Sequence, residues 1–164
     1  MPGKLLVFGA GFTGSRLVAA LQAEGWQAAG TSRSGENGTL LFEDGGRLAG
    51  EALKGVTHVI ASVPPGGDGD PVLNAHAGDL ARSETLVWAG YLSTTGVYGD
   101  HGGAWVDELS ETRPTAERSK RRLAAEMAWT EWGKAAGIPV QIFRLAGIYV
   151  PGRNALERVQ GGKA

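Results

Sequence analysis

A six-residue glycine motif near the start of the chain is of a kind that holds phosphate groups. The motif, Gly9-Ala10-Gly11-Phe12-Thr13-Gly14, has the form GxGxxG and follows the apolar run at residues 5–8. Its first glycine permits a tight turn, the second lets a pyrophosphate approach the backbone, and the third lets a helix pack closely on a strand. A following helix N-terminus adds N–H groups and a partial positive charge. We therefore expect nucleotide binding by Gly9, Gly11, Phe12, Thr13 and Gly14. The alternative is a glycine-rich turn that binds nothing.

The residues after the second expected strand bear on the choice of cofactor. NAD sites usually place Asp or Glu there, where the acid binds the ribose 2′-hydroxyl. This chain has Gly30-Thr31-Ser32-Arg33-Ser34, which contains no acid. The Arg33 guanidinium suits charge-assisted hydrogen bonds to a 2′-phosphate, with Ser32 beside it. We expect NADP to be favoured and leave NAD open, with a solvated loop cation as the alternative interpretation of Arg33.

A third group of residues follows the fourth expected strand. Ser62, Val63 and Pro64 stand there, and ligands of open α/β sheets bind at the carboxyl ends of the strands. We expect these three residues to border the cofactor. The three histidines have no metal-ligand spacing and the chain has no cysteine, so we expect no metal site.

Short apolar runs alternate with segments of helical periodicity along the chain. Strands are expected at 5–8, 27–31, 40–42, 56–63, 86–93 and 140–145, and helices at 13–24, 71–83 and 115–136, with a further helix start at 154–160. In the longest helix, Leu123 with Met127 and Ala124 with Ala128 have i, i+4 spacing. The alternation predicts an α/β fold, a Rossmann-type doubly wound parallel sheet of about six strands with helices on both faces.

Length and composition limit the class of protein. The 164 residues carry 16 Lys+Arg and 17 Asp+Glu, a net charge of −1, and 42% are hydrophobic. This is the composition of a globular domain with a core, and the charge balance argues against a general nucleic-acid binder. No apolar run approaches the ~18 residues of a membrane span. We expect one NAD(P)-binding domain over residues 1–164, in the cytoplasm, with no membrane partner.

Two further motifs, taken with the glycine motif, give the sequence a family resemblance. Residues 92–99 read Leu-Ser-Thr-Thr-Gly-Val-Tyr-Gly, and residues 114–120 read Pro-Thr-Ala-Glu-Arg-Ser-Lys. The chain resembles the extended short-chain dehydrogenase/reductase family, also called the NAD-dependent epimerase/dehydratase family. In that family the first motif ends the fifth strand and the second is P-x-Y-x-x-S-K. Residues 106–108, 143–145 and 148–152 also resemble family segments, so the likeness covers nearly the whole chain.

The resemblance implies hydride exchange at the nicotinamide, with a Tyr as acid/base, a Lys on the nicotinamide ribose, and a Ser or Thr orienting the substrate. By position, Lys120 matches the Lys and Thr94 the Ser/Thr, while Ala116 replaces the Tyr and cannot transfer a proton. Tyr98 is a candidate substitute. The chain is identified as an atypical member without the catalytic Tyr.

Two functions remain open at this point. One is an oxidoreductase or epimerase that acts on a sugar-nucleotide or another small hydroxylated substrate. The other is a catalytically inactive NADP-binding module in regulation or assembly, which Ala116 favours. Family members continue beyond the sixth strand, so the resemblance also implies that the substrate region is largely missing. We expect the helix at 115–136 to be the surface of a homodimer, if one forms.

Overall fold

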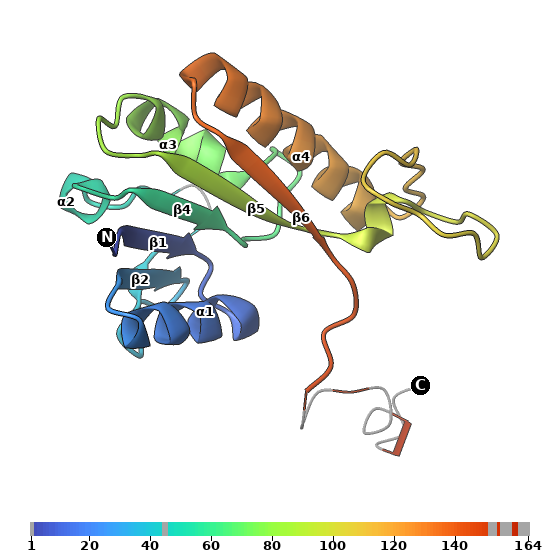
Figure 1. Cartoon of the computed structure of the whole chain (residues 1–164), viewed down its shortest axis with the longest axis horizontal. Helices are drawn as coiled ribbons and strands as arrows, with labels where there is room; N and C mark the ends of the chain where they lie inside the picture. Colours follow the sequence, from blue (N-terminus) through green and yellow to red (C-terminus); the bar gives the residue numbers. More distant parts are fainter. Residues whose placement is uncertain (1, 44–45, 151–153, 155–158, 161–164) are drawn as a thin grey trace.

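The chain folds around a parallel sheet that has helices on both faces (Figure 1). The computed structural model describes residues 2–43, 46–150, 154 and 159–160. Its strands are β1 Lys4–Phe8, β2 Gln27–Ser32, β3 Leu40–Leu41, β4 His58–Ala61, β5 Trp88–Thr94 and β6 Val140–Leu145. Its helices are α1 Phe12–Ala23, α2 Gly50–Leu53, α3 Pro71–Ala81 and α4 Glu117–Ala136, with a 3-10 turn, η1, at Thr95–Val97. The strand order is β3-β2-β1-β4-β5-β6, and every neighbouring pair is parallel.

The central strands read as continuous apolar runs because both of their faces are covered. Leu6 and Val59 belong to the core cluster under α3 and α4. Leu5 and Val7 point the other way, into a smaller cluster with the apolar side of α1. Adjacent residues of a strand face opposite sides of a sheet, so β1 alone contributes to both cores. The predicted fold class is confirmed.

The strand lengths differ from the sequence prediction where a partner strand ends. The run at 56–63 forms only the four residues of β4, because β1 offers partners only from Leu5 to Phe8 before the turn at Gly9. Helix α4 begins at Glu117, since Ala116 has an extended backbone. The short α2 and η1 were not expected. The helix start expected at 154–160 lies almost wholly outside the described residues.

Helix α4 buries a different side from the one its alanine and methionine spacing indicates. Ala125, Trp129 and Gly133 are buried against the sheet, together with Ser119 and Glu126. Met127 is 59% exposed. The spacing predicts the helix correctly, but the side that packs on the sheet is the one that carries Trp129. This side chain is fully buried, and its ring centre lies 5.4 Å from that of Trp132.

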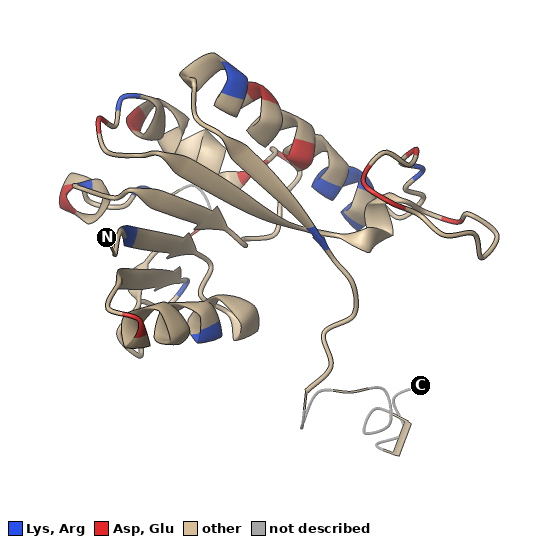
Figure 2. Cartoon of the chain, in the orientation of Figure 1, with Lys and Arg blue, Asp and Glu red and all other residues tan. Residues whose placement is uncertain are grey.

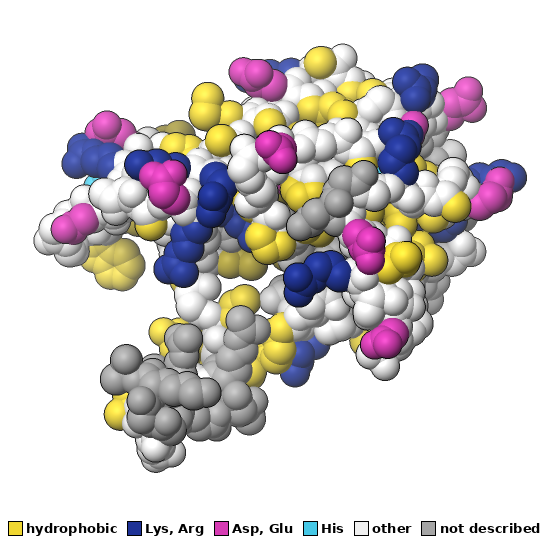
Figure 3. Space-filling view, turned by 180° about the vertical axis from the view of Figure 1, so that it is seen from behind, with side chains coloured by type: hydrophobic (Ala, Val, Ile, Leu, Met, Phe, Trp, Pro, Cys, Tyr) yellow, Lys and Arg dark blue, Asp and Glu magenta, His cyan; other side chains and the backbone are white. Residues whose placement is uncertain are grey.

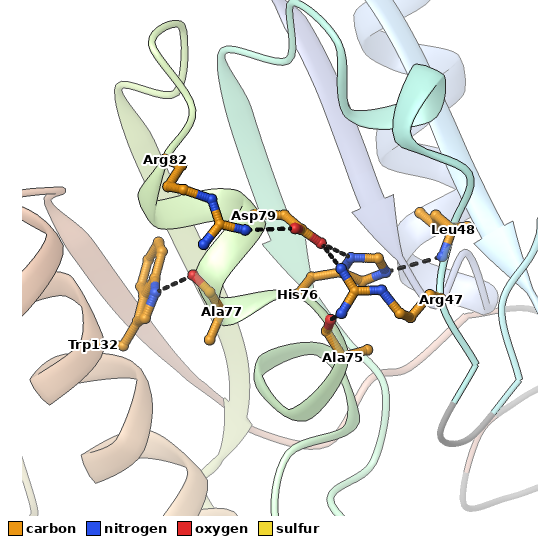
Figure 4. Close-up of polar contacts among 8 residues, drawn as sticks. All are labelled: Arg47, Leu48, Ala75, His76, Ala77, Asp79, Arg82 and Trp132. Atoms are coloured by element: carbon orange, nitrogen blue, oxygen red, sulfur yellow. Dashed lines mark hydrogen bonds and ion pairs between the residues drawn. The ribbon is translucent and has the colours of Figure 1, made fainter.

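A histidine of α3 fastens this helix to the segment that follows β3 (Figure 4). The buried His76 accepts the backbone N–H of Leu48 at Nε2, at 3.0 Å. A backbone N–H can only donate, so the ring proton is on Nδ1, which donates to Asp79 Oδ2 at 3.0 Å. The His76 ring therefore bridges the two segments.

The Asp79 carboxylate also forms ion pairs with two arginines, Arg47 and Arg82 (Figure 4). Arg47 binds its Oδ2 and also donates to the carbonyl of Ala75 at 2.6 Å, while Arg82 donates to Oδ1 at 3.1 Å. The hydrogen bond from His76, and then the charges of Arg47 and Arg82, lower the pKa of Asp79.

The charges do not gather on one face. Figure 2 shows Lys and Arg interspersed with Asp and Glu along the elements, and Figure 3 shows hydrophobic side chains in several separate places on the opposite side. None of the described helices combines the length and the hydropathy needed to cross a membrane. The described residues also include no group of three metal-ligating His, Cys, Asp or Glu side chains.

Candidate functional site

A cleft of about 320 Å³ opens at the carboxyl ends of the central strands. Its walls come from the glycine loop, from the ends of β4, β5 and β6, and from one turn of α4. The lining residues are Phe12, Thr13, Ser62, Leu92, Ser93, Thr94, Arg122, Leu145, Ala146 and Ile148. This is the place where the order of strands reverses, between β1 and β4, which is where open α/β sheets bind ligands.

A second hollow, of about 510 Å³, lies before the first residues of β4 and β5, near Arg47, Asp79 and Arg82. It is larger, but these three groups already pair with one another. None of the residues predicted for the site lines it. We therefore take the cleft, and not this hollow, as the candidate site.

The three glycines of the loop meet three different geometric demands. Gly9 has a φ of +85°, and a Cβ there would lie 3.0 Å from the nitrogen of Val63. A Cβ at Gly14 would lie 2.9 Å from the Gly9 oxygen and 3.0 Å from a methyl group of Val7. A Cβ at Gly11 would meet no atom within 4 Å. Gly9 thus makes the turn, Gly14 makes the close packing of α1 on β1, and Gly11 leaves open space in front of the backbone.

The loop is tied to β2 by a buried threonine. Gly9 N–H donates to Thr31 Oγ1 at 3.0 Å, and Ala10 N–H donates to the Thr31 carbonyl at 2.7 Å. Gly30 allows this approach, since a Cβ there would lie 2.3 Å from the Cβ of Ala10. The sequence analysis did not identify Gly30 as part of the site. A glycine inside an otherwise regular strand was the available signal.

Helix α1 begins with its first turn directed at the cleft. Its N-cap is Gly11, which has no side chain to cap the first N–H groups. Phe12 and Thr13 both line the cleft. Arg16 lies over the Phe12 ring at 3.6 Å and donates to the Phe12 carbonyl at 3.2 Å. These contacts fix the Phe12 ring at the edge of the cleft.

The loop after β2 holds Ser32 and leaves Arg33 in solvent. Ser32 Oγ accepts the N–H of Gly35 at 3.0 Å and shares a hydrogen bond of 2.6 Å with Thr39 Oγ1. Arg33 is exposed and makes no hydrogen bond or ion pair with the described residues. Ser32 therefore shapes the turn, and the Arg33 guanidinium stays available.

The residues after β4 lie against the glycine loop. Ser62 N–H donates to the Phe8 carbonyl at 2.8 Å, and Ser62 lines the cleft. Val63 is half-buried against Gly9, and Pro64 is exposed. The structure thus brings Ser62 and Val63 together with the loop.

Of the three candidate catalytic residues, Thr94 alone is among the residues that line the cleft. Thr94 lines the cleft, and its Oγ1 accepts the N–H of Gly96 at 3.1 Å. Tyr98 is buried, with the Arg144 guanidinium 4.8 Å from its ring centre. Lys120 is on the outer side of α4, where its Nζ pairs with Glu117 at 2.7 Å. Neither Tyr98 nor Lys120 is among the residues that line the cleft.

The cation that lines the cleft is Arg122. Its Nη1 donates to the carbonyl of Leu92 at 2.9 Å and to the Tyr91 hydroxyl at 3.1 Å. Burial raises the pKa of Tyr91 to about 12, against the opposing effect of Arg122. Tyr91 therefore stays a neutral partner. No motif marks Arg122 in the sequence; its position follows only from the side of α4 that packs on the sheet.

A buried carboxyl near this arginine caps α3. Asp70 Oδ1 accepts the N–H groups of Val72 and Leu73, each at 3.0 Å. Asp70 Oδ2 makes no hydrogen bond with the described residues, although the Trp129 indole is near enough to favour the charged form. Burial outweighs these effects and raises the pKa of Asp70.

The comparisons with known proteins rest on solved structures. No protein-family model matches the sequence, and no curated protein matches it. A functionally unknown conserved protein from Silicibacter pomeroyi DSS is 44% identical, with a TM-score of 0.82, over 93% of this chain and 56% of its own. A nucleoside-diphosphate sugar epimerase from Corynebacterium glutamicum is 21% identical, with a TM-score of 0.75, over 100% of this chain and 38% of its own. The fold is a Rossmann fold.

A third similar structure is a dTDP-glucose 4,6-dehydratase from Bacillus anthracis, solved in complex with NAD. It is 18% identical, with a TM-score of 0.75, over 98% of this chain and 62% of its own. The chain thus spans less than two thirds of the length of each of these three proteins. Similarity at 18% and 21% identity supports the Rossmann fold, and the 44% identical protein has no known function.

Proposed function

We propose that this chain is a dinucleotide-binding domain of the NAD-dependent epimerase/dehydratase type, with NADP preferred over NAD. The observation that carries the proposal is the contrast among the glycines of the loop. Gly9 and Gly14 have no room for a side chain, while Gly11 has open space in front of it at the start of α1. Tight packing behind a loop and space before it are what a pyrophosphate needs.

Described residues at and around the glycine-loop end of the cleft fit such a cofactor. The loop and the first turn of α1, with Phe12 and Thr13, would hold the pyrophosphate. Arg33, which pairs with none of the described residues, would bind the 2′-phosphate, with Ser32 shaping its turn. Ser62, Val63 and Pro64 would border the middle of the cofactor. A bound nicotinamide dinucleotide supplies hydride transfer.

Proton transfer is the step that this chain supports least. A general acid or base must be able to reach the reacting group, and the residues that line the cleft include no Tyr, His, Lys, Asp or Glu. Thr94 can orient a substrate oxygen by a hydrogen bond. Lys120 can join it only if it leaves Glu117. We therefore favour cofactor binding as the function of these residues. The second candidate is the activity of the epimerase/dehydratase type, an oxidoreductase or epimerase that acts on a sugar-nucleotide or another small hydroxylated substrate.

Calorimetric titration with NADPH and NADH tests the binding proposal. Gly11→Val should fold normally, because no atom lies within 4 Å of the new Cβ, and should bind neither cofactor. Gly50→Val is the matched control, since Gly50 also has open surroundings and lies in α2, away from the cleft. Equal binding by the wild type and Gly11→Val would refute the site.

A second pair of titrations tests the preference for NADP. Arg33→Ala should weaken NADPH binding by about 1–3 kcal/mol, the range for hydrogen bonds to charged groups, and leave NADH nearly unchanged. Arg118→Ala, an exposed arginine on α4, is the control. Equal losses of binding free energy for NADPH and NADH would mean that Arg33 does not bind the 2′-phosphate.

The catalytic alternative is tested by turnover. The wild type and Ala116→Tyr would be incubated with NADP or NAD and a panel of sugar nucleotides and small alcohols, while reduced cofactor is followed by absorbance. Ala116 is the exposed N-cap of α4, so the new side chain has room. Turnover by the wild type would favour the enzyme, and turnover by neither protein would favour the binding module.

A further inference from the structure

Arg122 is a half-buried cation that forms no ion pair with a carboxylate of the described residues. Four other arginines of the described chain pair with a carboxylate: Arg47, Arg82, Arg113 and Arg144. The Arg122 guanidinium has no described carboxylate within 4.0 Å, and both of its hydrogen bonds go to neutral oxygens through Nη1. Its Nε and Nη2 make no hydrogen bond with the described residues. Asp70 lies near enough to interact electrostatically, but burial opposes its charged form.

The position of Arg122 separates it from the glycine loop. Its anchors, Tyr91 and Leu92, belong to β5, and β4 stands between β5 and β1. Neighbouring strands lie about 4.8 Å apart, so the loop that ends β1 is roughly 10 Å across the sheet from this anchor. Phosphates held at the start of α1 would therefore leave Arg122 without a partner.

The walls around Arg122 suit a small polar molecule rather than a second nucleotide base. Thr94 offers a hydroxyl, whereas the Ser93 hydroxyl is already donated to Glu126. Leu145 and Ile148 supply apolar surface on the side of β6. A planar guanidinium with free N–H groups binds carboxylate and phosphate oxygens in a forked geometry.

We propose that Arg122 binds the negatively charged oxygen group, a carboxylate or phosphate, of a second small ligand that lies beside Thr94 at the β5 end of the cleft. The role of that molecule as a substrate rests on the proposed function, since the cofactor would occupy the end of the cleft at the glycine loop. The binding of the anion itself does not, because Arg122 and its anchors are independent of the loop.

Calorimetry with two probe anions tests this proposal. Malonate and, separately, inorganic phosphate would be titrated at low ionic strength into NADPH-saturated protein. We expect the wild type to bind at least one of them and Arg122→Gln to bind it at least ten-fold more weakly. Arg121 is the exposed neighbour on the same helix, and the affinity of Arg121→Gln for the anion should stay within two-fold of that of the wild type. A preference for malonate would identify a carboxylate as the group bound, and a preference for phosphate a phosphoryl group.

Three outcomes would overturn the proposal. The first is that the wild type binds neither anion. The second is that Arg121→Gln and Arg122→Gln weaken anion binding equally. The third is that phosphate binding is lost when NADPH is added, which would place the anion on the glycine loop. If Arg122→Gln does not fold, as judged by circular dichroism, Arg122→Lys replaces it. Lysine keeps the positive charge but cannot donate two parallel hydrogen bonds as a guanidinium does. The Arg122→Lys variant should therefore bind the anion more weakly than the wild type and Arg121→Gln do, but still measurably.

The same titrations distinguish this proposal from the proposed function. If neither NADPH nor NADH binds, but malonate or phosphate binds to the unliganded protein and depends on Arg122, the dinucleotide proposal fails and the anion site stands. If NADPH binds and the anions do not distinguish Arg122→Gln from the wild type, the anion site fails alone.

Discussion

Glu126 Oε2 lies 2.8 Å from Nη2 of Arg144, in an ion pair that joins α4 to the carboxyl end of β6. The Arg144 Nε–H adds contacts of 3.2 Å to both carboxylate oxygens, and Ser93 of β5 donates to Oε1 at 2.5 Å. The hydrogen bonds that Arg144 donates to Glu126 raise the pKa of Arg144. One buried carboxylate thus holds the helix and the last two strands together beside the cleft.

Removing this carboxylate should destabilise the fold strongly. Breaking a buried ion pair from one side costs about 3–5 kcal/mol, and we expect Glu126→Ala near the lower end, because the Arg144 side chain is 20% exposed. Urea unfolding measures the change. Glu131→Ala, on the exposed side of α4, should cost less than about 0.5 kcal/mol. The double variant Glu126→Leu/Arg144→Leu should recover most of the loss, since apolar replacement of a buried pair is often neutral.

The contact between Gly30 and Ala10 gives a reciprocal steric test. Gly30→Ala would bring two Cβ atoms to 2.3 Å, so we expect a loss of about 1–3 kcal/mol from overpacking and weaker NADPH binding. Ala10→Gly/Gly30→Ala should restore both, because the next atoms around the new Cβ lie at 3.7 Å. Thermal unfolding and calorimetry check the pair. Failure of the second change to rescue the first would show that the loop is held in another way.

The His76–Asp79 pair predicts a dependence of stability on pH. The pKa of Asp79 is lowered, first by the hydrogen bond from His76, so its contribution is present above the unfolded value of 3.8 and is lost as the pH falls through the folded value below it. Asp79→Asn should cost about 1–2 kcal/mol at pH 7. The difference from the wild type in urea unfolding should shrink below pH 4. A constant difference down to pH 2.5 would mean that the charge of Asp79 contributes nothing.

The exposed side of α4 predicts self-association. Met127 is 59% exposed there, with the exposed Ala124 and Ala128 on either side. If this side is the expected dimer surface, Met127→Glu should raise the dissociation constant at least ten-fold in sedimentation equilibrium, about 1.4 kcal/mol. Val87→Glu changes a residue that is 58% exposed elsewhere and should have no effect. A wild type that sediments as a monomer at 100-fold its working concentration would contradict the expectation.

Local chemistry explains what the sequence could predict. The turn and the close packing of the Gly9–Gly14 loop could be predicted from the motif, because Gly14 packs on Gly9 and on Val7 of the strand just before it. The parallel sheet followed from the alternation of runs, and β6 was predicted with its exact bounds at Val140–Leu145. Such features depend on neighbouring residues or on one strand and the helix after it.

What the sequence could not predict depends on how elements pack. The side of α4 that faces the sheet places Arg122 in the cleft and Lys120 outside it, and i, i+4 spacing alone cannot choose between two sides of a helix that is alanine-rich all round. Gly90 inside β5 makes room for Trp88, whose ring atom Cη2 would lie 2.5 Å from a Cβ there.

The walls of the cleft come from the beginning of α1, the end of β4, the end of β5, the middle of α4 and the segment after β6. A nascent chain therefore lacks the complete cleft until β6 has joined β5, which is the last pairing in chain order. Any molecule that binds across the cleft recognises only the finished fold. At 100 times its dissociation constant it would add about 2.7 kcal/mol to the free energy of unfolding, so the cellular supply of that molecule would set how long each copy survives proteolysis.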